Sequence, residues 1–262
     1  MRSSLVGSEM CIRDRLLLAL WSGTKLVIMK KWDPPEAVRL IELEKVSRFG
    51  GVPTMAAEIL GEAKKVGAKL ESIRLIDTGG AARPADQARE MAESIPNVLT
   101  GTSYGMTETN ALGIAIRGKE YLENPEVTGR LIAPLAEMRI VDEFDNDVEI
   151  GNVGELVLKS AANMRCYLNK DAETSEVLKD GWLYTGDLAK IDKNELITLV
   201  DRKKNIIIRG GENISAQEVQ TVILEHPDVI EAAIFALPNE RLGEIVGACV
   251  FCGETSNADE DS

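Results

Sequence analysis

The sequence of 262 residues contains one histidine, four cysteines and no long hydrophobic run. Four cysteines form no disulfide framework for a chain of this size, which favours a reducing cytoplasm. The single histidine, His226, is followed by Pro227 at the predicted end of a helix, so a structural role is favoured over metal chemistry. The apolar runs are far shorter than the roughly 20 residues of a membrane-spanning helix. These absences argue against a disulfide-rich secreted domain, a histidine metal site and a helical membrane protein.

Positive charge is also scarce. The chain has 30 basic and 43 acidic residues and a net charge of −13, which argues against nucleic acid or an anionic membrane as a bulk partner. A chain of this charge must concentrate its basic residues locally to bind a polyanionic ligand. The densest such cluster outside the first 15 residues contains Arg202, Lys203, Lys204 and Arg209.

The segment from Tyr184 to Val219 combines four features of a ligand-binding junction. Thr185-Gly186-Asp187 predicts a tight turn with one carboxylate, and a carboxylate suits paired hydroxyls such as a ribose diol. The basic cluster follows, and then Gly210-Gly211, where the backbone can approach a ligand or adopt positive φ. Ser215 to Glu218 has capping-box spacing and predicts a helix start. Each feature alone is most simply a turn, a solvated face or a bend, but their order favours a functional interpretation.

The first hundred residues predict alternating strands and helices. A strand is predicted at 27–29, and a helix begins at Pro34-Pro35 with Val38, Ile41, Leu40 and Leu43 facing inward. Residues 50–54 predict a loop, which is followed by a helix to about residue 66. Strands at 73–76 and 98–99 flank a helix with Ala88, Met91, Ala92 and Ile95 on one face. This order is a βαβ unit, which implies a parallel pair with a site at the carboxyl ends of its strands.

Both strands of this unit run into turns that suit a ligand. Gly79-Gly80-Ala81 lacks bulk, so a flat base could lie against its backbone. The predicted turn from Gly101 to Glu108 offers Tyr104 for stacking, Thr107 for a phosphate and Glu108 for a magnesium ion. The alternative is a loop with a buried tyrosine and a helix-starting Thr-Glu pair.

After Glu108 the chain becomes rich in predicted strands. Strands are predicted at 138–141 and 154–159, a short helix at 171–178, and a hairpin from 188–191 and 196–200. Beyond Lys204 a smaller α+β unit is predicted, with strands at 206–208, 229–235 and 245–251 and a helix at 215–226. Cys249-x-x-Cys252 lies in an apolar, strand-like run, and both cysteines are predicted to be core residues rather than a metal site or a redox motif.

Three motifs follow one another in the sequence: G-V-P-T-M at 51–55, T-G-G-A at 78–81 and Y-G-M-T-E-T at 104–109. Their order makes the functional interpretation specific. Together with the Tyr184–Val219 segment, this series resembles the adenylate-forming (AMP-binding) superfamily, and within it the acyl-CoA synthetase, or fatty-acid–CoA ligase, branch. The resemblance covers about residues 16–251. Cys166-Tyr167 stands where the family has Gly-Tyr, and we expect this departure to touch none of the proposed ligand contacts.

The resemblance implies a role for each motif residue. The ATP or AMP contacts would be Gly79, Gly80 and Ala81 along the adenine, Tyr104 stacked on it, Gly105 and Met106 in the same motif, Thr107 on the α-phosphate, Asp187 on the ribose hydroxyls, and Arg202 assisting. Glu108 would hold Mg²⁺. Gly210 and Gly211 would border the pantetheine channel of CoA, and Lys204 would be the hinge. The residues implied in catalysis are Thr107, Glu108 and Lys204.

The implied fold is α/β, with a parallel βαβ subdomain and a β-rich subdomain of the large AMP-binding domain, followed by a truncated small α+β domain. Residues 1–15 would be a non-native leader, 16–203 the C-terminal part of the large domain, 204–252 the start of the small domain, and 253–262 a frayed acidic tail. The family's phosphate loop and terminal lysine are not found in this sequence. We therefore expect an internal fragment that is inactive alone.

The implied parent enzyme is an ATP-dependent carboxylate–CoA ligase that acts through an acyl-adenylate. Its partners would be ATP, Mg²⁺, CoA and a fatty or medium-chain acid, without nucleic acid or a transmembrane segment. It would work in the cytoplasm, with contact to a membrane only through a lipid substrate. The alternatives are an adenylation domain that loads a carrier protein and a non-catalytic nucleotide-binding fragment. A dinucleotide-dependent hydride-transfer enzyme is disfavoured, because no G-x-G-x-x-G follows a predicted strand.

Overall fold

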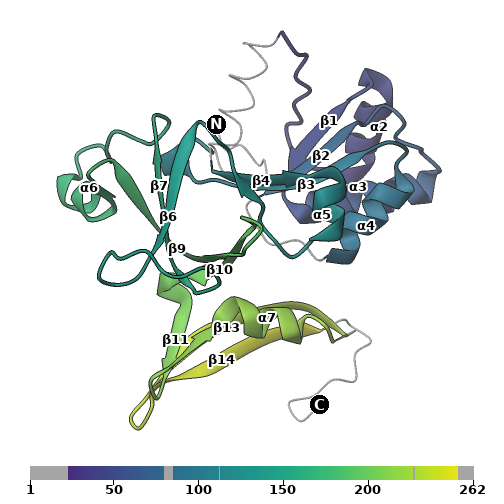
Figure 1. Cartoon of the computed structure of the whole chain (residues 1–262). Coiled ribbons are helices and arrows are strands. Elements are labelled where there is room, and N and C mark those ends of the chain that lie inside the picture. Colours follow the sequence, from purple (N-terminus) through teal and green to yellow (C-terminus); the bar gives the residue numbers. More distant parts are fainter. Residues whose placement is uncertain (1–22, 80–84, 112, 227, 253–262) are drawn as a thin grey trace. The chain divides into compact units, whose positions relative to one another are not determined.

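The computed structural model describes residues 23–79, 85–111, 113–226 and 228–252 (Figure 1). The chain divides into two compact units. The first unit comprises Met1–Met138, Leu158–Leu183 and Asp192–Thr198, and the second comprises Arg139–Val157, Tyr184–Ile191 and Leu199–Ser262. Among the described residues, no helix has both the length and the apolar character needed to cross a membrane.

The first unit contains a five-stranded sheet of order β1-β2-β3-β4-β5. Its strands are β1 (Arg48–Gly51), β2 (Leu75–Gly79), β3 (Leu99–Tyr104), β4 (Ile114–Arg117) and β5 (Arg130–Leu131). Strands β1, β2 and β3 are parallel, whereas β4 and β5 add on in antiparallel fashion. The predicted parallel pair is therefore confirmed, and the carboxyl ends of β2 and β3 lie side by side, with Gly79 opposite Ser103.

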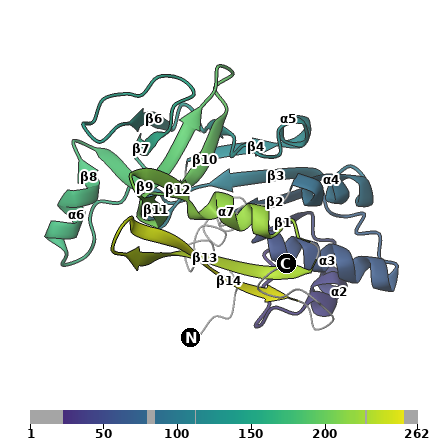
Figure 2. The same cartoon turned by 90° about the horizontal axis from the view of Figure 1, so that it is seen from below.

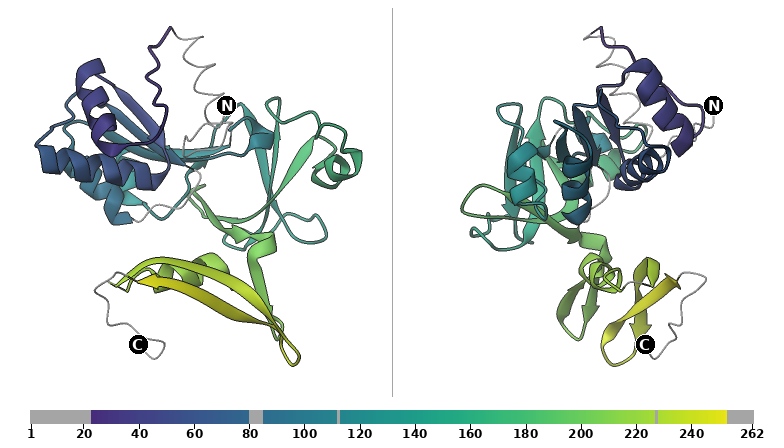
Figure 3. Two further views of the ribbon diagram at one scale, coloured as in Figure 1. Left: turned by 180° about the vertical axis from the view of Figure 1, so that it is seen from behind. Right: turned by 90° about the vertical axis from the view of Figure 1, so that its right-hand side faces the viewer.

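Four helices pack with this sheet: α2 (Pro34–Glu44), α3 (Pro53–Val66), α4 (Ala85–Ser94) and α5 (Gly118–Glu123). Asp33 caps α2 by accepting a 3.0 Å hydrogen bond from Glu36 N, and proline occupies the first turn of α2 and of α3. The views in Figures 1 and 3 show these helices gathered beside β1–β4. The apolar faces of α2, α3 and α4 join Ile76 of β2 in one buried cluster that includes Ile59 and Met91. Tyr121 of α5 belongs to a second buried cluster, with Ala88 and Ile116.

Several predicted features of this region are wrong. Residues 27–29 form no strand, and the predicted loop at 50–54 begins with the last two residues of β1. The sequence Arg-Phe-Gly-Gly has weak strand propensity, but pairing with β2 supplies its hydrogen bonds. Leu40 is only half-buried and Leu43 is 62% exposed. Leu43 lies two residues beyond the buried Ile41, about 200° around the helix, so the two cannot share a face.

A second sheet of order β10-β9-β7-β6 follows, with β8 paired to β9. Its strands are β6 (Ala136–Val141), β7 (Gly154–Ser160), β8 (Leu178–Lys179), β9 (Trp182–Ile191) and β10 (Ile197–Arg202), and α6 (Asp171–Val177) precedes β8. The predicted turn at Thr185-Gly186-Asp187 is wrong, because these residues lie inside β9. Gly186 does have a left-handed φ of 72°, so the strand is irregular at that residue.

The second unit ends in a four-stranded sheet of order β12-β11-β14-β13. Its elements are β11 (Ile206–Arg209), β12 (Glu212–Ser215), α7 (Ala216–Ile223), β13 (Val229–Asn239) and β14 (Gly243–Cys252). Helix α7 packs on β13, and Figure 2 shows it running along the long β13–β14 hairpin. Cys249 is exposed and Cys252 is half-buried, with both thiols free, so the predicted core position of this pair is wrong for Cys249.

Candidate functional site

The first group of candidate residues lies at the carboxyl ends of β2 and β3. Gly79 ends β2, and a Cβ there would lie 2.8 Å from the backbone oxygen of Ser103, so glycine permits this close approach. Gly80 and Ala81 lie outside the described residues. Tyr104 ends β3, so the predicted turn at Gly101–Tyr104 is wrong and the chain turns only at Gly105. The half-buried Tyr104 places its hydroxyl 3.9 Å from Met106 Sδ.

The turn after β3 folds tightly on itself. A Cβ on Gly105 would lie 2.5 Å from the carbonyl group of Ala111, and the short 3₁₀-helix η1 (Thr107–Thr109) closes the turn. Thr109 Oγ1 accepts a 3.1 Å hydrogen bond from Met106 N and is buried, whereas Thr107 is exposed and Glu108 is half-buried. Thr107, with the proposed phosphate role, is therefore exposed to solvent, whereas Glu108, with the proposed metal role, is only partly accessible.

Glu108 is held by a segment that the sequence does not mark as part of the site. The hydroxyl of Tyr167 donates a 2.7 Å hydrogen bond to Glu108 Oε1, and Met164 N donates one of 2.6 Å to the backbone oxygen of Glu108. Burial, and then the hydrogen bond to Glu108, raises the pKa of Tyr167 to about 12. Tyr167 is the tyrosine that the family's Gly-Tyr pair also has, so the departure from that pair lies at Cys166 alone. Cys166 itself is exposed and has no left-handed backbone.

The donor set of this turn fits a magnesium ion. Mg²⁺ is usually bound through one or two carboxylates together with substrate phosphates and water, rather than by an all-protein cage. Within the part of the chain that the structure describes, no group of three or more His, Cys, Asp or Glu side chains could hold a metal ion. Glu108 supplies the single carboxylate that the phosphate-dependent mode needs, beside the exposed hydroxyl of Thr107.

The second group lies in the second unit, on the adjacent strands β9 and β10. Arg202 Nε is 3.2 Å from Asp187 Oδ1, and Asp187 is only 6% exposed. The hydroxyl of Thr185 accepts from Asp187 N at 3.1 Å and donates to the backbone oxygen of Leu156 at 2.7 Å. The carboxylate is thus fixed in place with a cation beside it, and the Arg202 side chain stays 61% exposed.

Glu155 of β7 ties this group to the residues that follow Arg202. Its Oε1 accepts a 3.1 Å hydrogen bond from Gly186 N, and its Oε2 lies 3.0 Å from Lys203 Nζ. Lys203, Lys204 and Asn205 form the short 3₁₀-helix η2 between β10 and β11. Lys204 is exposed. Gly210 and Gly211 turn the chain from β11 into β12 with φ values of 60° and 93°, as their small size predicts.

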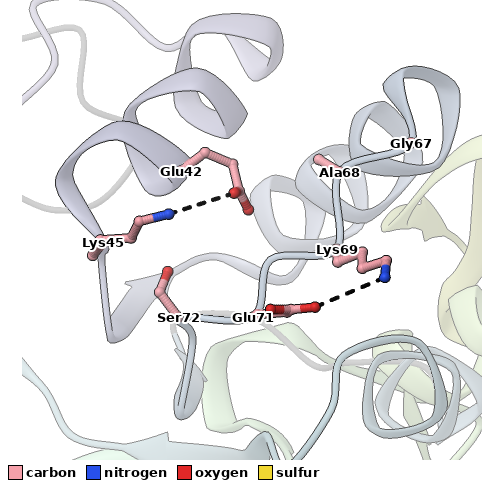
Figure 4. Close-up of a pocket in the computed structure, with 7 residues that line it drawn as sticks. All are labelled: Glu42, Lys45, Gly67, Ala68, Lys69, Glu71 and Ser72. Atoms are coloured by element: carbon pink, nitrogen blue, oxygen red, sulfur yellow. Dashed lines mark ion pairs between the residues drawn. The ribbon is translucent and has the colours of Figure 1, made fainter.

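A surface hollow in the first unit shares no residue with either group (Figure 4). It is lined by Glu42, Lys45, Gly67, Ala68, Lys69, Glu71 and Ser72. Its charged groups are engaged locally, since Lys45 pairs with Glu42 and Lys69 with Glu71, each at 4.0 Å. Glu42 also accepts a 3.1 Å hydrogen bond from Leu70 N. These contacts stabilise the ends of the neighbouring helices and mark no ligand site.

Comparison with known proteins places the chain in a family. The sequence profile of the AMP-binding enzyme family matches residues 10–168, and the chain belongs to that family. A 4-coumarate–CoA ligase-like protein 6 of Arabidopsis thaliana is 34% identical over 91% of this chain and 43% of its own length. A medium/long-chain-fatty-acid–CoA ligase of Mycobacterium tuberculosis is 30% identical over 91% of this chain and 42% of its own length.

The fold is similar to that of solved members of the family. The structure of o-succinylbenzoate–CoA synthetase from Bacillus subtilis in complex with ATP and magnesium superposes with a TM-score of 0.85 and 27% identity, over 96% of this chain and 51% of that one. The chain therefore spans about half the length of the relatives that it matches. The predicted resemblance and the predicted α/β fold class are both confirmed.

Proposed function

We propose that the protein carrying this sequence is an acid–CoA ligase that activates its substrate as an acyl-adenylate. Family membership supports this proposal, and the Y-G-M-T-E-T turn, with Thr107 exposed and Glu108 partly accessible, is the observation that carries it. A carboxylate oxygen of the acid would attack the α-phosphorus of ATP and release pyrophosphate. The CoA thiol, losing its proton, would then attack the acyl carbon and release AMP.

Each motif residue has a role in this scheme. Thr107 would donate a hydrogen bond to the α-phosphate, while Gly79, Gly80 and Ala81 would line the adenine and Tyr104 would stack on it. Asp187, acceptor-only and fixed inside β9, would accept hydrogen bonds from both ribose hydroxyls, with Arg202 holding its charge and orientation. Gly105 and Met106 would shape the turn around the phosphate. These contributions are positioning and charge stabilisation rather than covalent chemistry.

Glu108 would hold the magnesium ion, which supplies charge neutralisation on the phosphates when bound. Gly210 and Gly211 would leave room for the pantetheine arm of CoA beside the β11–β12 turn. Lys204 would be the hinge between a large domain ending near residue 203 and a small domain formed by residues 204–252. The exposed η2 segment, between two well-formed strands, supports that assignment.

The acid is proposed to be a fatty or medium-chain acid. The name of the Mycobacterium tuberculosis relative supports an aliphatic substrate, while the name of the Arabidopsis relative supports an aromatic one. A carrier protein in place of CoA is the second candidate acceptor. Formation of an acyl-CoA thioester in the assay below would favour CoA over a carrier protein.

The test uses the protein that carries this sequence, ATP, Mg²⁺, CoA and a panel of octanoate, palmitate, 4-coumarate and 2-succinylbenzoate. We expect acid-dependent release of AMP and pyrophosphate, and a thioester of matching mass, with the aliphatic acids preferred. Preference for 4-coumarate would overturn the substrate but not the reaction class. Release of ADP and phosphate, or no acid-dependent turnover with any member of the panel, would overturn the proposed function.

A further inference from the structure

Tyr167 lies 59 residues from Glu108 in sequence, yet its hydroxyl donates a hydrogen bond to the Glu108 carboxylate. The contact belongs to a larger junction. Residues 160–167, here called the brace, begin at the last residue of β7, and three hydrogen bonds join them to the turn at residues 106–111. The contacts are Tyr167 to Glu108, Met164 N to the Glu108 backbone oxygen, and the Asn110 side-chain amide to the backbone oxygen of Ala162.

The brace is itself well fixed. Ser160 Oγ accepts a 3.0 Å hydrogen bond from Ala162 N, and the Asn163 side chain donates one of 2.9 Å to the backbone oxygen of Leu158. At its other end, Tyr167 N donates to Thr174 Oγ1 of α6 at 3.0 Å. The hydroxyl that reaches Glu108 is therefore mounted on backbone that is held on both sides, as a positioning group requires.

We propose that Tyr167 is a positioning residue that aims the carboxylate of Glu108 at the magnesium ion of the nucleotide complex. The proposal rests on the proposed function and deepens it by adding a residue to the metal site. The tyrosine hydroxyl occupies Oε1 as a donor, which fixes the carboxylate plane and leaves Oε2 for the cation. The Glu108 side chain has three rotatable torsions. Without this hydrogen bond, the conformational entropy of those torsions would be lost when the ion binds, which would weaken binding.

The Tyr167 hydroxyl donates to Glu108 Oε1, and the backbone on both sides of it is held by hydrogen bonds, so the brace acts as a fixed support. Removing a residue that hydrogen-bonds to a metal-binding side chain typically lowers metal affinity by about 10- to 100-fold. The partly solvated setting of Glu108 favours the lower end of that range.

The test measures nucleotide binding by titration calorimetry, with ATP in the presence and absence of Mg²⁺ and with AMP alone. In the wild type, Mg²⁺ should strengthen ATP binding. Tyr167→Phe should reduce this gain by about tenfold and leave AMP affinity and the melting temperature nearly unchanged. Glu108→Gln should abolish the gain, and Tyr167→Phe should add nothing in the Glu108→Gln background.

Tyr121→Phe is the matched control, because Tyr121 is the buried tyrosine of α5 and belongs to neither group of candidate residues. It should leave the Mg²⁺ response unchanged. The inference is overturned if Tyr167→Phe keeps the full response, if it lowers the melting temperature and AMP affinity together, or if its effect persists beside Glu108→Gln. A wild type that binds neither ATP nor AMP overturns the proposed function instead, so the two failures are distinguishable.

Discussion

Ser215 Oγ donates a 2.6 Å hydrogen bond to Asp201 Oδ2, and the two residues stand on opposite sides of Lys204 in the sequence. Gln217 N donates to the same oxygen at 3.1 Å, and Arg202 N donates to Oδ1 at 2.6 Å. Burial alone would raise the pKa of Asp201, but these hydrogen bonds, led by that from Ser215, lower it below its ordinary value. Asp201 thus carries a negative charge at the N-terminus of α7, where the helix dipole favours it.

Asp201→Asn should lower the free energy of unfolding by about 1–3 kcal/mol, because it replaces charge-assisted hydrogen bonds to a buried carboxylate. The folded pKa lies below the unfolded one, so the stabilisation is complete above the unfolded value of about 3.9 and is lost as pH falls through the folded value. The gap between wild type and variant should be constant from about pH 7 to pH 5 and close below about pH 4.

Urea unfolding at several pH values measures this gap. Asp145→Asn is the control, because its carboxylate lies at an exposed ion pair with Arg139 and should change stability little. A gap of the same size at pH 7 and pH 3 would contradict the role given to the charge of Asp201.

The helix start at Ser215 was predictable from sequence because a cap is a local contact, and Ser215 Oγ does accept from Glu218 N at 3.1 Å. The contribution of Asp201 was not, because the fold brings it there from 14 residues away. The same distinction explains the Thr185-Gly186-Asp187 segment. Its composition favours a turn, but Gly186 N and Asp187 N donate to the side chains of Glu155 and Thr185, and the segment lies within β9.

The candidate site likewise has residues that local sequence predicts and one that only the fold brings in. Sequence motifs predict the Tyr104–Glu108 turn and the two residues of the Asp187–Arg202 pair, because each motif is contiguous or recurs in a fixed order. The support from Tyr167 could not be predicted, since nothing local to that residue indicates a partner 59 positions away. Strand ends were also misplaced, because β3 continues through a Gly-Thr-Ser segment of low strand propensity by pairing on both sides.

Gly101 separates two residues that pair across it. It lies opposite Asp77 of β2 and Arg117 of β4, and Arg117 Nη2 reaches Asp77 Oδ2 at 2.5 Å. A Cβ on Gly101 would lie 2.6 Å from Arg117 Cγ and 2.9 Å from the backbone oxygen of Ile116. Since Asp77 is only 7% exposed, displacing Arg117 would leave a poorly solvated carboxylate.

Gly101→Ala should therefore lower the free energy of unfolding by about 1–3 kcal/mol. Gly61→Ala is the matched control, because Gly61 lies inside α3 and a Cβ there meets nothing within 4 Å. That change should raise stability by about 0.5–1 kcal/mol through helix propensity. Urea titrations of both variants measure the difference, and changes of equal sign and size would contradict the packing argument.

Asp187→Ala should impair use of ATP if this carboxylate accepts both ribose hydroxyls. The loss of two charge-assisted hydrogen bonds, each worth about 1.5–3 kcal/mol, predicts a fall in kcat/KM for ATP on the order of 10²–10³, allowing for non-additivity. Deoxy-ATP should show a similar penalty with the wild type and little further loss with the variant. Asp147→Ala removes the Nε partner of another arginine, Arg139 at 2.7 Å, and should leave both values unchanged. Normal ATP kinetics for Asp187→Ala would contradict the diol assignment.

The proposed two-step reaction makes different demands on one site. Adenylation brings the acid and ATP together, whereas thioester formation needs a path for the CoA thiol, and a small domain that rotates on a short joint can serve both steps. The η2 segment, Lys203–Asn205, has the properties of such a joint, being short and charged and lying between β10 and β11. The Asp201–Ser215 hydrogen bond spans this segment, so any rotation there must break it.

Lys204→Pro should separate the two half-reactions. Proline fixes φ near −65° and disfavours helical backbone at the preceding residue, and Lys203 is in a 3₁₀ turn, so the variant should restrict the joint to fewer orientations. We expect adenylation, measured by pyrophosphate exchange, to persist, while thioester formation from supplied acyl-adenylate falls by about tenfold or more, which corresponds to at least about 1.4 kcal/mol in the barrier. Lys204→Ala removes the charge but not the backbone freedom, so it should keep both activities if Lys204 acts as a joint. If the proline variant loses both half-reactions to the same extent, or neither, Lys204 is not the hinge. A melting temperature of the proline variant well below that of Lys204→Ala would identify general destabilisation as the cause of a joint loss.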